Sequence, residues 1–332
     1  MTSRRRFHRY ALGLAAAGLG LPSLVRAQPG EYPSRPVRIV VPFAAGGGPD
    51  LLTRKMAVKL AEILGKGAVV VVENVVGAGG ILAAQNVARM APDGYNLLLG
   101  ASSHVVQKAM EPAVAFDPVK DFAHITRTVF TPSVLVVSAT SPYATVEALV
   151  AAAKAAPGKL NYASGGVGSA AHLCAAALAL QANIDVVHVP YKGSVEIVPS
   201  ILSGSTQFAI PIASTAIPQV QGGKVRALAV TSAQRMPALP NVPTLVEVFK
   251  TQDLALDAWF GLWAPAGTPA PVVDALFKAV TATYQDPALR ADSEAAGAIV
   301  APSASPAEFT RFIEAETRKL DKLVKAARLT VQ

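Results

Sequence analysis

Two glycine-rich turns, one in each half of the chain, carry residue types that could bind an anion. The first turn follows the apolar run Val37–Val41 and contains three consecutive glycines at 46–48. The second turn spans residues 161–169 and again joins a short strand to a helix. Glycines let a ligand approach the backbone, and a helix start presents N–H groups and about half a positive charge. Such turns also occur as plain connections in α/β folds, but two of them predict a ligand clamped between two lobes.

Histidine, serine and glycine patterns elsewhere do not predict a catalytic or cofactor site. His172 falls in a predicted helix and His188 in a predicted strand, with no partner at the spacing of metal ligands. Ser164 lies beside two glycines, but the chain lacks the G-x-S-x-G turn of hydrolases and a recognisable acid–base partner. The run at 77–80 is not a complete dinucleotide fingerprint, because Leu82 stands where the third glycine belongs. We therefore expect no metal, no cofactor and no catalysis.

The positive charge of the chain is concentrated at its start. The 332 residues carry a net charge of +8, and residues 1–27 contain five arginines and no acidic residue. The rest of the chain therefore has a net charge of +3. This mild excess forms no basic stripe and argues against nucleic acid as a partner.

Residues 1–27 have the pattern of an export signal. The letters SRRRF at 3–7 precede a weakly apolar run at 10–21, and VRA at 25–27 resembles a cleavage site. The apolar run is too short to span a membrane, and an arginine pair before Phe7 is typical of the twin-arginine route. An ordinary export signal with extra arginines stays an alternative. Either route predicts cleavage near Ala27 and a mature chain that starts near Gln28.

Alternating strands and helices predict two α/β units. In the first unit, strands are expected at 37–41, 68–73 and 96–100. Helices are expected at 50–64 and from the turn at 74–80 through Met90. In the second unit, strands are expected at 134–138, 160–163, 185–190, 207–212 and 225–232. A strand at 259–264 and three helices near 270–285, 287–296 and 306–327 follow. Because the first unit has few helices of its own, we expect this tail to return and cover it.

The predicted fold class is therefore α/β with two lobes, each a mostly parallel sheet flanked by helices. Residues 28–127 and 257–332 would form a discontinuous first lobe, and residues 128–256 the second lobe. Two crossings between the lobes would make a hinge that lets them close around a ligand. In open α/β sheets the ligand lies beyond the carboxyl ends of the strands.

Ordered motifs along nearly the whole mature chain indicate a family. They are YPSRPV at 32–37, VPFAAGG at 41–47, EN at 73–74 with GAGG at 77–80, APDGY at 91–95, DPVKDF at 117–122, GKLNYAS at 158–164, VPYKG at 189–193, RALAVTS at 226–232, PNVPT at 240–244, and WFG at 259–261 with APAGTP at 264–269. With these motifs the chain resembles the extracytoplasmic solute receptors of tripartite tricarboxylate transporters, also called the Bug family.

The resemblance implies a type II-like periplasmic binding protein with a small carboxylate ligand between its lobes. In such receptors the turns at 43–48 and 164–169 face each other and hold the carboxylate through backbone N–H groups and hydroxyls, beside the loop at 102–103. The candidate ligand-binding residues are Phe43, Ala44, Gly46, Gly47, Ser102, Ser103, Ser164, Gly166, Gly168, Ser169, Tyr191 and Lys192. A capping or turn role is equally open for each serine, a packing role for Tyr191 and a solvated role for Lys192.

The resemblance also implies partners. We expect a monomer that delivers its ligand to membrane permease subunits or reports it to a sensor protein.

Pro211-Ile212-Ala213-Ser214 stand where the family often shows Asp or Asn, and a less polar far wall would favour a ligand with an apolar tail. The alternative from another class is a secreted α/β enzyme that binds phosphate or a nucleotide at the same glycine-rich turns.

Overall fold

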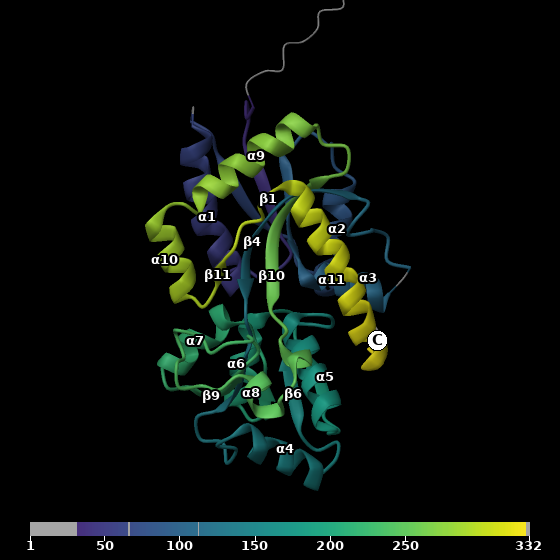
Figure 1. The fold of residues 1–332 in the computed structure, drawn as a ribbon, viewed down its shortest axis with the longest axis vertical. Helices are drawn as coiled ribbons and strands as arrows, with labels where there is room; N and C mark the ends of the chain where they lie inside the picture. Colours follow the sequence, from purple (N-terminus) through teal and green to yellow (C-terminus); the bar gives the residue numbers. More distant parts are fainter. Residues whose placement is uncertain (1–31, 66, 112, 330–332) are drawn as a thin grey trace, which may run out of the picture. The chain divides into compact units, whose positions relative to one another are not determined.

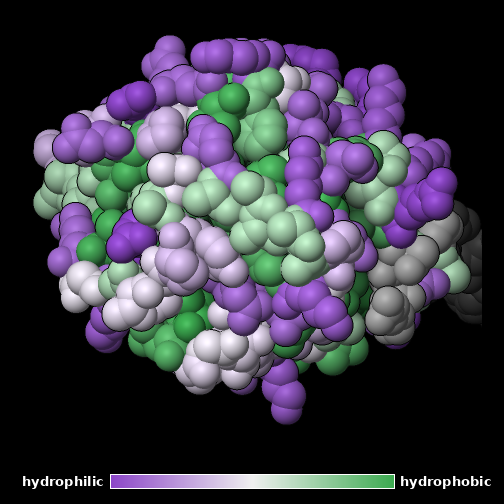
Figure 2. Space-filling view, turned by 90° about the horizontal axis from the view of Figure 1, so that it is seen from below, coloured by the Kyte–Doolittle hydropathy of each residue, from purple (hydrophilic) through white to green (hydrophobic). Residues whose placement is uncertain are grey.

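The structure is a computed structural model that describes residues 32–329, except residues 66 and 112. The predicted export signal and its cleavage site lie outside the described residues. Within them, no helix has both the length and the apolar character needed to cross a membrane. Figure 2 shows hydrophilic residues interspersed with hydrophobic ones over one face of the molecule.

A six-stranded sheet takes its strands from two separate parts of the chain (Figure 1). The strand order is β11-β4-β10-β3-β1-β2. Strand bounds are β1 (Val37–Val41), β2 (Val70–Asn74), β3 (Asn96–Ala101), β4 (Phe122–Thr131), β10 (Ala258–Pro265) and β11 (Ile299–Val300). We call this sheet with its helices the first lobe. Since β10 lies between β3 and β4, the prediction of a discontinuous first lobe is confirmed.

Helices pack on both faces of the first sheet. They are α1 (Gly48–Leu64), η1 (Ala78–Gly80), α2 (Ile81–Ala88), α3 (Ser102–Met110), α9 (Ala270–Thr283), α10 (Pro287–Ala295) and α11 (Pro306–Ala326). Successive strand residues point to opposite faces. Ile39 accordingly packs in a cluster with α1 and α9, whereas Val40 packs in a cluster with α2, α3 and α11. The C-terminal helices thus cover the N-terminal strands, as the sequence predicts.

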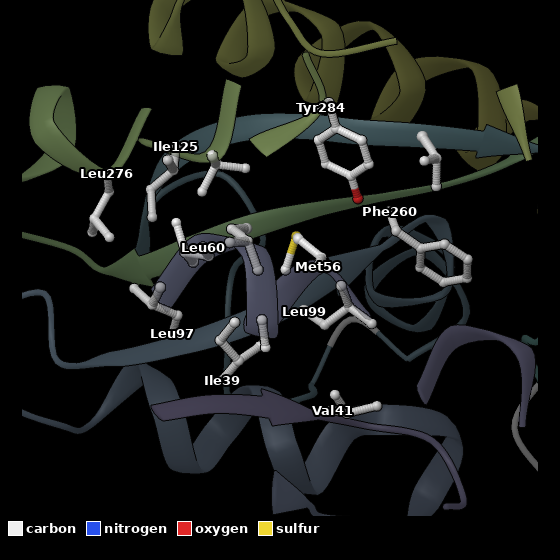
Figure 3. Packing of buried hydrophobic residues seen from close by; sticks show 14 of the residues in the cluster. Ile39, Val41, Met56, Leu60, Leu97, Leu99, Ile125, Phe260, Leu276 and Tyr284 are labelled. Carbon is white, nitrogen blue, oxygen red and sulfur yellow. The ribbon is translucent and has the colours of Figure 1, made fainter. Parts of the chain in front are cut away.

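The core beneath α1 is apolar and fully buried. Met56 and Leu60 extend from α1 among Ile39 and Leu97 of the strands (Figure 3). Both α1 side chains are no more than 1% exposed. Pro49 occupies the first turn of α1, where its missing N–H would have had no partner. This packing fixes the start of α1, and with it the turn that precedes the helix.

The second lobe is built on a five-stranded sheet of order β7-β6-β8-β5-β9. Its strands are β5 (Val134–Ser138), β6 (Asn161–Ser164), β7 (Val187–Pro190), β8 (Phe208–Ala209) and β9 (Val225–Val230). Its helices are α4 (Val146–Ala155), α5 (Ala170–Ala182), η2 (Ser194–Glu196), α6 (Ile197–Leu202), α7 (Ala213–Gln221), α8 (Leu245–Phe249) and η3 (Gln252–Leu254). All five strands come from one continuous part of the chain.

Both sheets are mixed, whereas mostly parallel sheets were expected. In the first sheet β1 is parallel to β2 and β3, but β10 is antiparallel to β3 and β4. In the second sheet β5 is antiparallel to β8 and β9. The reason is the crossing between lobes: β4 carries the chain out of the first lobe and β10 brings it back beside β4 (Figure 1). Neighbouring strands that leave and return must run in opposite directions.

Two of the elements missed by the sequence analysis lie next to the lobe crossing or the strand ends. The first is β4, a ten-residue strand that begins at Phe122, at the end of the motif DPVKDF, where the sequence analysis expected no strand. The polar letters at 101–104 suggested a loop, but α3 begins there at Ser102. His104 explains this start, because its Nδ1 accepts a hydrogen bond from the Ala101 N–H at 3.0 Å. A buried histidine therefore takes the capping position usually held by Glu or Gln.

Candidate functional site

A cavity of about 710 Å³ lies between the two lobes. On the first-lobe side, its lining comes from residues that follow β1, β2 and β3, together with Ala258 and Phe260 of β10. On the second-lobe side, the lining comes from residues that follow β6, β7 and β8. The cavity thus lies at the strand ends where ligands bind in open α/β sheets.

Seven of the twelve predicted site residues line this cavity. They are Phe43, Ser102, Ser103, Gly166, Ser169, Tyr191 and Lys192. The other five do not line it: Ala44, Gly46, Gly47, Ser164 and Gly168. Gly46 and Gly47 line a second cavity of about 460 Å³ instead. The two predicted turns therefore meet at one cavity, but only part of each turn faces it.

The first turn is held by a buried carboxylate. Oδ2 of Asp50 accepts from the Gly46 N–H at 2.8 Å, Oδ1 accepts from Asn74 Nδ2 at 2.9 Å, and Arg54 pairs with Oδ1 at 3.0 Å. Asn74 also donates to the carbonyl of Phe43 at 2.9 Å. Burial opposes ionisation, but the bonds from Arg54, Gly46 and Asn74 outweigh it and hold the pKa of Asp50 below its ordinary value. The N–H of Gly46 is therefore bonded to Asp50 and is not open to a ligand.

The second turn rests on a stack of three rings. His172 and His188 are parallel with centroids 4.0 Å apart, and Tyr162 stacks on His188 at 4.9 Å. Ser164 Oγ lies 2.7 Å from His188 Nε2, and the Gly168 N–H donates to His172 Nδ1 at 3.0 Å. Burial and the neighbouring His188 lower the pKa of His172 to about 3, and burial lowers that of His188 to about 4. Both rings are neutral at pH 7, so His172 can accept the bond that shapes the turn.

Three helices begin at the cavity. Ile81 of α2, Ser102 of α3 and Ala170 of α5 are the first residues of their helices, and each lines the cavity. The N–H groups of a first helical turn have no partner within the helix, and the helix dipole makes this end positive. Ser169 caps α5, because its Oγ accepts from the N–H of His172 at 3.4 Å. The arrangement favours a negatively charged ligand group.

Ser103 brings a buried side-chain hydroxyl to the edge of the cavity. Its side chain is 4% exposed and lines the cavity. Its Oγ has no hydrogen-bond partner among the described residues. An unpaired buried hydroxyl costs about 1–3 kcal/mol. An oxygen of a bound ligand would remove this cost by accepting a hydrogen bond from the hydroxyl.

A third glycine-rich turn, which the sequence analysis did not assign to the site, also lines the cavity. Residues 77–80 follow β2 and precede α2, and all four have positive φ angles, including 46° at Ala78. A Cβ on Gly79 would overlap Gln107 Nε2 and lie 2.7 Å from the carbonyl of Val167. The signal was available, since this stretch has the same order of strand, glycines and helix as the two predicted turns.

The lobes touch at small residues around the cavity. Gln107 of the first lobe donates from Nε2 to the carbonyl of Val167 in the second lobe at 2.6 Å. A Cβ on Gly48 would overlap Ser214 Oγ of the second lobe. These contacts leave no room for larger side chains where the two lobes meet.

Charge is scarce in the cavity lining. Lys192 is the one charged residue among the described lining residues, and its side chain is exposed. The described part of the chain contains no group of three His, Cys, Asp or Glu residues that could hold a metal ion. The lining is otherwise made of backbone, small polar side chains and apolar side chains, which suits an anion with an uncharged body.

Solved structures with the same fold define the class of protein. The periplasmic binding protein BugD superposes with a TM-score of 0.84 at 32% identity, covering 91% of this chain and 100% of that chain. The Rpa4515 protein of R. palustris, solved with adipate, superposes with a TM-score of 0.85 at 30% identity, covering 90% of this chain and 99% of that chain. The fold is therefore that of a two-lobed periplasmic binding protein.

Sequence comparison then gives the family. Residues 52–329 match the model of the tripartite tricarboxylate transporter family receptor. A relative described as the UPF0065 protein in the tcbD-tcbE intergenic region of Pseudomonas sp. (strain P51) is 35% identical over 298 residues, covering 90% of this chain and 88% of the relative. The chain belongs to this receptor family, which confirms the resemblance seen in the sequence motifs.

Proposed function

We propose that this protein is an exported receptor that captures a small carboxylate between its two lobes. The observation that carries the proposal is the unpartnered, buried hydroxyl of Ser103 at a cavity where α2, α3 and α5 begin. One carboxylate could accept from Ser103 and from first-turn N–H groups, and hydrogen bonds to charged groups are each worth about 1.5–3 kcal/mol. The adipate bound by the R. palustris relative supports a carboxylic acid as ligand.

Capture would be completed by lobe closure. We assign residues 28–127 and 257–332 to the first lobe and residues 128–256 to the second, with hinge strands β4 and β10 between them. Closure excludes water from the cavity and strengthens the bonds to the carboxylate. Nothing in this cycle requires catalysis or a cofactor.

The wider role follows from the family. A monomeric receptor in the periplasm, exported by a twin-arginine-like signal cleaved near Ala27, would pass its ligand to membrane permease subunits or report it to a sensor. Mass spectrometry of the mature protein should find an N-terminus near Gln28. A mature protein that still begins at Met1 would contradict export with cleavage.

A thermal-shift panel tests the ligand class. We expect the melting temperature to rise with one or more carboxylic acids, because a ligand that binds only the folded state stabilises it. The panel contains mono-, di- and tricarboxylates, aromatic acids, amino acids, inorganic phosphate and nucleotides. A response to nucleotides or phosphate, with none to carboxylates, would support the phosphate-binding enzyme instead.

Ser103→Ala should weaken binding of the acid found in this panel about tenfold, because the carboxylate loses one hydroxyl donor. Isothermal titration calorimetry gives the dissociation constants. Thr131→Val is the matched control: it removes another buried hydroxyl without a partner, at a position that does not line the cavity. Equal losses in the two variants would contradict a contact between Ser103 and the ligand.

Gln107→Ala should weaken ligand binding by about 0.5–1.5 kcal/mol, the value of one neutral hydrogen bond. The bond from Gln107 Nε2 to Val167 exists only while the lobes are closed together at this point. Small-angle scattering should show a smaller radius of gyration on ligand addition in the native protein and a smaller change in the variant at equal ligand concentration. Gln181→Ala, at an exposed position of α5, serves as control and should leave both measurements unchanged.

A further inference from the structure

We propose that the cavity selects a monocarboxylate with an apolar body of about six or more carbon atoms, and rejects dicarboxylates, tricarboxylates and amino acids. This inference rests on the proposed function, because it specifies the ligand of the same cavity. Its basis is the contrast between the donors at the helix starts and the carbon-lined wall contributed by β10, α6 and the segment after β8.

The apolar wall is formed by side chains from both lobes. Phe43 and Phe260 meet edge to face with centroids 5.7 Å apart, and Phe260 also appears in the core view of Figure 3. Ile197 at the start of α6 and Ile212 before α7 line the cavity from the second lobe. Ile197, Ile212 and Phe260 are each at most 8% exposed. A ligand chain against this wall gains about fourfold in affinity for each methylene that it buries.

The two lining residues after β8, Pro211 and Ile212, offer no side-chain donor to a second carboxylate. Pro211 has no N–H, and its carbonyl accepts from the Val134 N–H at 2.8 Å. The carbonyl of Ile212 accepts from the N–H groups of Thr215 and Ala216 at 2.9 and 3.1 Å. In the third glycine turn, the Gly80 N–H is likewise used by the Gly77 carbonyl at 3.0 Å. Neither Pro211 nor Gly80 therefore has an N–H left to donate, and the side chains of Pro211 and Ile212 are carbon only.

The charge of the lining residues also disfavours amino acids and dicarboxylates as ligands. None of the described lining residues is Asp or Glu, so the ammonium of an amino acid would lack a partner among positive helix ends. A second carboxylate against the carbon wall would lose its water without replacement, at a cost of about a hundredfold or more in affinity. Lys192 is exposed, and a salt bridge there would recover about fivefold at most.

Calorimetric titration of hexanoate and adipate tests the inference, because these acids share six carbons and differ in one carboxylate. We expect hexanoate to bind at least tenfold more tightly than adipate. Phenylacetate should also bind, and citrate and leucine should give no measurable heat. Adipate binding as tightly as hexanoate, or more tightly, overturns the selectivity but leaves the carboxylate receptor standing. If no acid binds, the proposed function fails and the selectivity fails with it.

Variants of the wall give a second test. Ile212→Val and Ile212→Thr both shorten the side chain and differ by a methyl group against a hydroxyl. Ile212→Val should weaken hexanoate a few-fold and keep the ratio of hexanoate to adipate affinity, whereas Ile212→Thr should lower that ratio about fivefold or more. Val76 lines the cavity and is 43% exposed, so that a substitution there should not affect folding. Val76→Thr keeps the side-chain shape and should also lower the ratio of hexanoate to adipate affinity. An unchanged ratio in both threonine variants would overturn the inference.

Discussion

Gly48→Ala should weaken carboxylate binding about 5- to 150-fold while leaving the protein folded. Gly48 begins α1 and lies against Ser214 of α7 in the other lobe, so that a Cβ at this position would overlap the Ser214 hydroxyl. Overpacking of such a contact costs about 1–3 kcal/mol, which corresponds to this range of affinity. The cost falls on closure, because the two residues belong to different lobes. Titration calorimetry and the unliganded melting temperature separate binding from folding.

A second change should restore binding. In the double variant Gly48→Ala with Ser214→Gly, the overlapping side chain is absent, and the next atom of Ser214 is its backbone carbon at 3.4 Å from the new Cβ. This is an ordinary contact distance, so the affinity should return to within about threefold of the single variant Ser214→Gly. Loss of affinity in the double variant equal to that in Gly48→Ala would show that the lobes do not close through this contact.

Asp50→Asn should lower the free energy of unfolding by about 2–3 kcal/mol, since hydrogen bonds to a charged acceptor are worth about 1.5–3 kcal/mol each. The Asn side chain has one acceptor oxygen where Asp50 has two. Its NH2 group would therefore face either the Gly46 N–H or the Asn74 NH2, and two donors cannot bond to each other. The ion pair with Arg54 adds little to this figure, because the Arg54 side chain is 46% exposed. Urea denaturation measures the loss. Asp321→Asn is the control, since Asp321 pairs with Lys325 on the exposed side of α11.

The same variant predicts a dependence on pH. The pKa of Asp50 is lowered in the folded protein, so its contribution to stability is complete above the unfolded value of about 4 and is lost as the pH falls through the folded pKa. The stability difference between the native protein and Asp50→Asn should therefore be constant from pH 5 to 8 and shrink below about pH 4. A difference that grows towards acid would contradict this account of the loop.

Most of the fold could be predicted from hydrophobic periodicity. The apolar run at 37–41 and the spacing of Met56 and Leu60 on α1 identify a strand and a helix because burial of one face dictates both patterns. Strand direction could not be predicted in this way. Whether β10 runs with or against its neighbours depends on how the chain returns between lobes, and no local pattern at 258–265 encodes that route.

The predicted turns lie at one cavity, but the sequence did not indicate which of their residues face it. Residues 102–103 and parts of the glycine-rich turn at 161–169 line one cavity. The sequence does not say which amides the protein keeps for itself. Asp50 takes the amide of Gly46, and His172 takes that of Gly168, because in each turn a side chain four residues further along, in the helix that follows, bonds back to the turn. The segment at 77–80 was set aside because it failed a nucleotide motif, although its glycines suit close approach to any ligand.

The strand order of the first sheet has a consequence for synthesis. All strands of the second sheet have been synthesised once residue 230 is added, whereas β10, in the interior of the first sheet, is encoded only at 258–265. A nascent chain stopped between these points holds a complete second sheet and an interrupted first one. Since domains fold as units as their residues become available, the first sheet can be completed only after residues 258–265 have been synthesised.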